Sequence, residues 1–141
     1  MTARVTLTAR LRDLIVDHCL AAAPHEGCGL LAMDGDRVVG VYPTDNQDAS
    51  SSSYTIPPRQ LYEAVMDSES RGWEVGGVFH SHPAGPSAMS GTDLARVADP
   101  AWLYVVVSLA GPEPVLVGWR GGSEVEVSSR RGGRRVADSP R

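Results

Sequence analysis

Near the middle of the chain, residues 79–93 read FHSHPAGPSAMSGTD. The preceding residues, 73–79, predict a strand that runs into His80 and His82. Because side chains alternate between the two faces of a strand, both imidazoles point to one side, with Cα atoms about 6.6 Å apart. Two imidazoles at that spacing can close around one metal ion at about 2.0–2.1 Å per bond. The stretch therefore predicts a metal site at the end of a strand.

A carboxylate follows the two histidines at a short distance along the chain. Asp93 comes after a turn rich in proline and glycine, close enough to supply a third ligand. Two histidines and one carboxylate leave a tetrahedral zinc ion one open position for water, as in catalytic rather than structural sites. We therefore expect one zinc ion per chain, bound by His80, His82 and Asp93, and a hydrolytic reaction.

Hydrolysis at such an ion needs a base that is not itself a ligand. Glu26 is the candidate, because it lies at an expected helix-to-strand junction, in the sequence PHEGCG of residues 24–29. A carboxylate beside a metal-bound water can take its proton and pass it to a leaving amine. Ser90 could donate a hydrogen bond to the oxyanion that forms on the scissile carbonyl, a contribution of about 2.7–4 kcal/mol in comparable sites.

The length and composition favour a single globular domain. The chain has 141 residues, of which 42% are apolar and 21% charged, enough for one domain with its own core. No apolar run approaches the roughly 20 residues of a membrane span, and the first residues lack the pattern of a signal peptide. Cys19 and Cys28 are too few for a disulfide framework and are expected as buried hydrophobic residues. We expect a cytoplasmic protein that does not bind membranes.

The charges are unevenly distributed. All 13 basic residues are arginine, so Schiff-base and P-loop lysine chemistry is excluded. Residues 128–141 carry a net charge of +4, which leaves −8 on residues 1–127. An acidic body argues against nucleic acid as the partner and would suit a basic peptide, although solubility alone also explains it. We expect a folded domain over residues 1–128 and a basic, disordered tail over residues 129–141.

The pattern along the chain alternates between helices and strands. An apolar stripe at helical spacing predicts a helix that begins after Thr8 and ends at Pro24. His18 lies on its apolar face and is expected to be a core or boundary residue rather than a ligand. Pro57-Pro58 opens a second helix, which ends near Gly72, and a third helix starts near Ser90. Strands are expected at residues 28–33, 37–41, 54–56, 73–79, 101–109, 114–119 and 123–128. Residues 44–53 form a serine-rich loop. These elements predict an α/β fold with one mixed sheet flanked by helices.

Five of the residues singled out above occur at the spacing of a known signature. Glu26, His80, His82, Ser90 and Asp93 resemble the JAMM (MPN+) metalloprotease motif, Glu…His-Ser/Thr-His-Pro-x(6)-Ser-x-x-Asp. The resemblance implies an MPN/JAB, cytidine-deaminase-like fold, with a mixed and largely antiparallel sheet. It also implies that the two histidines and Asp93 bind zinc, that Glu26 is the general acid/base, and that Ser90 stabilises the tetrahedral intermediate.

The resemblance covers about residues 8–128, and residues 26–31, EGCGLL, also look like the family's Glu-x-Cys-Gly strand. One departure is Met89, which precedes the serine where many small bacterial members have proline. The chain is most similar to small stand-alone bacterial members that act on ubiquitin-like sulfur-carrier proteins. The resemblance implies cleavage after the carrier's C-terminal Gly-Gly, with release of an amino acid such as cysteine. The tail is expected to lie extended beside the strand that begins near Cys28, under the loop of residues 50–53.

Other interpretations of the same residues remain open. Two strand histidines can simply face solvent, Ser90 and Asp93 can form a helix capping box, and Glu26 can be an exposed turn carboxylate. Two histidines and a carboxylate also describe Fe(II) oxygenases, although the acid there usually lies within the first His-x-Asp pair. A third alternative is a catalytically inactive interaction module of the same fold. The oligomeric state is not indicated.

Overall fold

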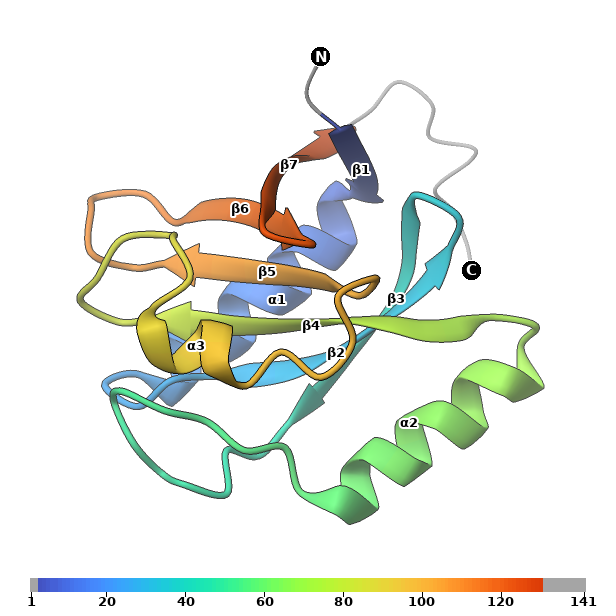
Figure 1. Cartoon of the computed structure of the whole chain (residues 1–141), viewed down its shortest axis with the longest axis horizontal. Coiled ribbons are helices and arrows are strands. Elements are labelled where there is room, and N and C mark those ends of the chain that lie inside the picture. Colours follow the sequence, from blue (N-terminus) through green and yellow to red (C-terminus); the bar gives the residue numbers. More distant parts are fainter. Residues whose placement is uncertain (1–2, 131–141) are drawn as a thin grey trace.

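The computed structural model of the chain describes residues 3–130 (Figure 1). Seven strands and three helices make up this part. The strands are β1 (Ala3–Thr8), β2 (Cys28–Asp34), β3 (Arg37–Thr44), β4 (Glu74–His82), β5 (Leu103–Ser108), β6 (Val115–Arg120) and β7 (Ser123–Arg130), and the helices are α1 (Ala9–Ala22), α2 (Pro58–Ser70) and α3 (Gly91–Ala95). None of these helices is long and apolar enough to cross a membrane.

The strands form one curved sheet in the order β1-β3-β2-β4-β5-β6-β7, and β7 pairs with β1 so that the sheet closes on itself. Neighbours are antiparallel except for β4 with β5 and the two pairings of β1. The mixed, largely antiparallel sheet flanked by helices is therefore confirmed. Its closure was not predicted, because the pairing of the two ends depends on contacts about 120 residues apart along the chain.

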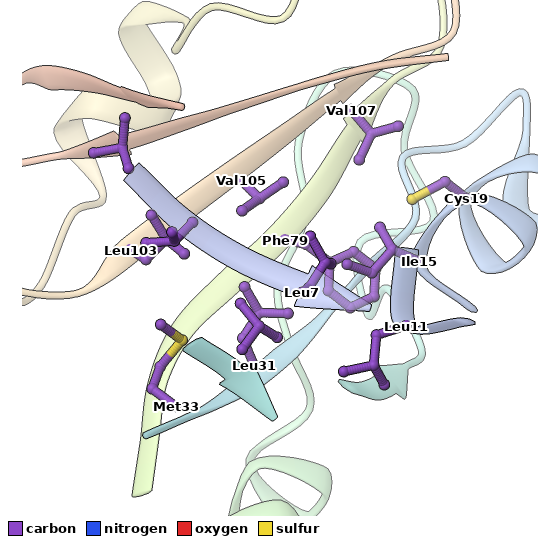
Figure 2. Packing of buried hydrophobic residues seen from close by; sticks show 13 residues of the cluster. Leu7, Leu11, Ile15, Cys19, Leu31, Met33, Phe79, Leu103, Val105 and Val107 are labelled. Carbon is purple, nitrogen blue, oxygen red and sulfur yellow. The ribbon is translucent and has the colours of Figure 1, made fainter. Parts of the chain in front are cut away.

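The main core lies between α1 and the sheet, as Figure 2 shows. The helix contributes Leu11, Ile15 and Cys19, which meet buried residues of the strands. Thr8 caps the helix as predicted, because its hydroxyl oxygen accepts a hydrogen bond from the backbone N–H of Leu11 at 3.1 Å. A smaller cluster, which includes Leu30, lies beneath α2 on the other face of the sheet.

Strand β1 was missing from the sequence-based prediction. It lies parallel to β7, and its Val5 and Leu7 are buried while the residues between and before them are not. This alternation is the period-2 signal of a strand, but it covers only two core positions and runs directly into α1. Strand β7 ends at Arg130, two residues beyond the predicted end of this strand. Residues 131–141 of the expected tail lie outside the described residues.

One further prediction was wrong. Residues 54–56 are not a strand, because no neighbouring strand pairs with them; they end the loop before α2. In α2 the buried residues are Ala64 and Ser68, whereas Leu61 and Met66 are 37% and 48% exposed. An apolar residue on a helix is buried only where the helix meets the sheet, and α2 meets it along its small residues.

Gly29, in the centre of the sheet, lies where its neighbours leave no room for a side chain. A Cβ at this position would overlap the ring of Phe79 and lie 2.5 Å from the carbonyl oxygen of Tyr42. We expect Gly29→Ala to lower the free energy of unfolding by about 1–3 kcal/mol, as overpacking of a core does. Urea unfolding measures this, with Gly111→Ala as the matched control because nothing lies within 4 Å of its Cβ position. Equal effects of the two substitutions would contradict the observed packing.

Candidate metal centre and active site

His80 and His82 lie at the end of β4, in the middle of the sheet. His80 pairs with Cys28 of β2 on one side and Val106 of β5 on the other. Its side chain is fully buried, and that of His82 is 11% exposed. The two histidines therefore do not face open solvent, which was the simplest alternative to a metal site.

The three predicted ligands meet at one point. The Nε2 atoms of His80 and His82 lie 3.2 Å apart, and they lie 3.1 Å and 3.0 Å from Oδ2 of Asp93. The ligands of a tetrahedral ion with bonds of about 2.0–2.1 Å would be separated by about 3.3–3.4 Å. The observed triangle is within a few tenths of an ångström of that size. Its two imidazoles and one carboxylate fit a metal ion, and the group can hold one.

A helix capping box places the carboxylate. The hydroxyl oxygen of Ser90 accepts from the backbone N–H of Asp93 at 3.0 Å, and Oδ2 of Asp93 accepts from the N–H of Ser90 at 2.9 Å. The capping box weighed as an alternative to the metal site is therefore present and coexists with it. Burial alone would raise the pKa of Asp93, but hydrogen bonds to His80 and His82 hold that pKa well below its usual range.

The two histidines differ in how their rings are held. Nδ1 of His82 lies 2.7 Å from the carbonyl oxygen of Pro86 and donates to it in the tautomer that leaves Nε2 free for a metal. Nδ1 of His80 is buried and has no hydrogen-bond partner among residues 3–130. Burial lowers the pKa of His80, whereas the hydrogen bond to Asp93 raises the pKa of His82.

Glu26 is a buried carboxyl group close to this cluster. It is 3% exposed, and its Oε1 atom has no hydrogen-bond partner in the described part of the chain. Burial raises its pKa to about 7; nearby His82 lowers the value, and Asp93 and Asp48 raise it. The alternative of an exposed turn carboxylate is excluded. A carboxyl group with a pKa near neutrality can both accept and donate a proton at physiological pH.

The loop between β3 and α2 contributes a residue that the sequence analysis did not identify. The ring of Tyr54 stacks on the imidazole of His80, with centroids 4.5 Å apart and an interplanar angle of 23°. Ser50, in the same loop, accepts a backbone hydrogen bond from Glu26 at 2.8 Å. The loop therefore reaches both the base candidate and a ligand candidate. No motif marks Tyr54, because its role depends on the three-dimensional path of the loop.

The remaining candidate residues do not join the site. His18 was predicted to be a core or boundary residue; it is half-buried, and its Nε2 lies 3.1 Å and 2.9 Å from the carbonyl oxygens of Cys28 and Thr44. Cys19 and Cys28 are free and buried, as predicted. Burial raises their pKa values to about 12 and about 11, so both thiols are neutral and neither can act as a thiolate nucleophile.

Comparison with known proteins supports the fold assignment. Residues 8–120 match the model of a family described as prokaryotic homologues of the JAB domain. The desampylase of Haloferax volcanii is 32% identical over 117 residues, which cover 78% of this chain and 84% of that protein. A Thermus thermophilus protein named "Probable TtuB-protein conjugate cleaving protease" is 38% identical over 79 residues, 55% of this chain and 52% of that protein. A solved structure from Desulfitobacterium hafniense superimposes with a TM-score of 0.81 at 36% identity, covering 91% of this chain and 94% of that one.

Burial of Glu26 has a measurable effect on stability. Its pKa is 4.5 when unperturbed and about 7 in the folded protein, so the unfolded chain releases this proton at lower pH than the folded one. Glu26 therefore destabilises the metal-free fold progressively between pH 4.5 and 7, and the cost persists above pH 7. We expect Glu26→Gln to stabilise the metal-free protein at pH 8, by on the order of 3 kcal/mol at most.

Urea unfolding of both proteins at pH 4 and pH 8, with chelator present, measures this difference. Below pH 4.5 the wild-type carboxyl group is neutral in both states, and the two proteins should then be similar in stability. A stability difference of the same size at both pH values would contradict the raised pKa of Glu26.

Proposed function

Because this chain belongs to the family of prokaryotic JAB-domain homologues, we propose that it is a zinc-dependent peptidase that cleaves the bond after the C-terminal Gly-Gly of a ubiquitin-like protein. The observation that carries the proposal is the convergence of His80, His82 and Asp93 on one point, beside a buried Glu26 whose pKa lies near 7. An interaction module has no need of a carboxyl group kept unpaired in the interior, which costs stability.

The donor set favours zinc. Two neutral imidazoles and one carboxylate, without sulfur, are the ligands of catalytic zinc sites that keep a position for water. Bound zinc would act as a Lewis acid on the scissile carbonyl and would lower the pKa of a bound water. His80 and His82 would each offer Nε2, and Asp93 would offer Oδ2 while its helix cap holds it in place.

Glu26 is the proton carrier in this proposal. Its unpartnered Oε1 atom leaves it free to take a proton from the attacking water. With a pKa of about 7, it can return that proton to the leaving amine without a large energetic cost in either direction. Its backbone is fixed by Ser50, whose carbonyl oxygen accepts from the Glu26 N–H at 2.8 Å.

Ser90 is placed to stabilise the oxyanion. Its oxygen already accepts the N–H of Asp93, so the hydroxyl proton remains available to a substrate. The residue is exposed, whereas the metal cluster behind it is not. A hydroxyl that donates to the developing oxyanion contributes to the rate without changing how the metal is held.

The substrate proposal rests on the relatives. One of them is named for cleaving conjugates of the protein TtuB, and we propose that this chain likewise acts on a bond at the C-terminus of a ubiquitin-like sulfur carrier. A Gly-Gly tail has no side chains to keep the scissile carbonyl away from a buried metal. Cysteine attached to that carrier is one leaving group that this reaction would release.

The strand pairing of β2 limits the path that the tail can take. Strand β2 begins at Cys28 and is paired along both edges, with β3 and with β4. An extended tail therefore cannot add to β2 as a further strand. We propose that the tail approaches over the end of β4, where His82 and Ser90 are the accessible members of the site.

Zinc binding can be tested on its own. We expect one zinc per chain in the wild type after dialysis, and loss of that zinc in His82→Ala because one of three ligands is removed. Affinity should fall below about pH 6, since an imidazole must be neutral to bind. Elemental analysis measures the content, with His25→Ala as the control because His25 is exposed and outside the cluster. Full zinc content in His82→Ala, or iron in place of zinc, would refute the assignment.

Catalysis can be tested with a ubiquitin-like carrier joined through its Gly-Gly end to a peptide. We expect Glu26→Gln to keep its zinc and to lower kcat by a factor of at least about 100, because it removes the proton carrier. Mass spectrometry of the carrier product measures the rate and places the cut.

A matched carrier that ends in Ala-Ala is the control, and we expect it to be cleaved far more slowly. An effect of Glu26→Gln on KM alone would mean that Glu26 binds substrate and does not transfer protons. Equal cleavage of the two carriers would contradict the proposed tail recognition. A wild-type protein that binds zinc and binds the carrier without cleaving it would instead be an interaction module.

A further inference from the structure

Among the described residues, none of the protein groups that usually orient a metal-bound histidine contacts His80. Such histidines almost always donate their second ring N–H to a carboxylate, a carbonyl or a water, which fixes the ring. His82 follows this rule through the carbonyl oxygen of Pro86. For His80, no protein group among residues 3–130 fills this role at its buried Nδ1 atom. Packing against the ring is another way to fix its plane.

The ring of Tyr54 stacks on the face of the His80 imidazole. It lies nearly parallel to the His80 imidazole, with centroids 4.5 Å apart and planes inclined by 23°. His82 meets His80 edge-on instead, at 5.0 Å and 64°. A stacked aromatic ring resists rotation of its partner, because tilting either ring separates the two faces. Figure 1 shows the loop that carries Tyr54 leading from β3 to α2, next to α3.

The backbone around Tyr54 is held on both sides. On one side, the amide of Asn46 donates to the carbonyl oxygen of Ser53 at 3.0 Å. On the other, Oδ1 of Asn46 accepts from the N–H of Thr55 at 3.1 Å, and Arg96 donates to the Thr55 hydroxyl at 2.9 Å. The same Asn46 amide also donates to the carbonyl oxygen of Glu26 at 3.1 Å. The neighbours of Tyr54 are thus bonded, through Asn46, to the segment before β2 that bears Glu26, and to Arg96, which directly follows the helix that bears the third ligand.

We propose that Tyr54 is a positioning residue for the metal, whose stacked ring holds His80 with Nε2 directed at His82 and Asp93. Asn46 sets the position of that ring relative to Glu26. The proposal rests on the proposed zinc site. In this proposal the face of the Tyr54 ring orients His80, and the phenol hydroxyl plays no part.

The test measures zinc affinity by chelator competition in three variants. Tyr54→Phe keeps the ring and should bind zinc within about threefold of the wild type. Tyr54→Leu removes the ring and should weaken binding about 10–100-fold, the cost of losing an outer contact of a metal ligand. Tyr62→Leu is the matched control, because Tyr62 is 64% exposed on α2, and it should leave the affinity unchanged. If Tyr54→Leu does not fold, Tyr54→Met is also ring-free and serves the same comparison.

The visible spectrum of the cobalt-substituted proteins separates positioning from general stability. At saturating Co²⁺, a displaced His80 should change the band positions in Tyr54→Leu but not in Tyr54→Phe, whereas a merely less stable fold would leave them unchanged. The proposal is wrong if Tyr54→Leu binds zinc like the wild type with an unchanged cobalt spectrum, or if Tyr54→Phe is as weak as Tyr54→Leu. Failure of the wild type to bind zinc at all would refute the proposed function itself.

Discussion

The site depends on one atom, Oδ2 of Asp93. It lies 3.1 Å from His80 Nε2 and 3.0 Å from His82 Nε2, and it accepts the N–H of Ser90 at 2.9 Å. Strand β4 supplies the two histidines, and the start of α3 supplies the carboxylate. The hydrogen bond from the Ser90 N–H to Oδ2 opposes rotation of the carboxylate away from the proposed metal position. Formation of the helix cap and the metal ligation proposed for Asp93 would therefore stabilise each other.

Glu26 shows the opposite arrangement, a group that the fold leaves without a partner. Its Oε1 atom has no partner among the described residues, and burial raises its pKa to about 7, which lowers the stability of the metal-free protein. Asn46 and Ser50 bind only its backbone, so the carboxyl group stays free to exchange a proton. A residue that costs stability in this way is expected where a reaction needs it. The loop with Tyr54 contacts both sides of the site: Ser50 bonds the backbone of Glu26, and the ring of Tyr54 stacks on His80.

Much of this could be predicted from sequence because the decisive signals are local. Alternation along a strand placed His80 and His82 on one face, and a capping pattern marked the start of α3. The signature spacing added Glu26. What could not be predicted depends on distant contacts: the closure of the sheet by β1 and β7, the irregular path of residues 54–56, and the stack of Tyr54 on His80. Tyr54 looked like part of a strand because its neighbours favour one, but no strand is available to pair with it.

The most direct test of the central claim is X-ray absorption at the zinc edge of the zinc-loaded protein. We expect a shell of four nitrogen and oxygen atoms at about 2.0–2.1 Å from the zinc: one imidazole nitrogen each from His80 and His82, one oxygen from Asp93 and one from water. We expect no sulfur, since the buried thiols of Cys19 and Cys28 lie outside the cluster. A sulfur ligand, or a closed shell without a water position, would contradict a catalytic zinc at this site.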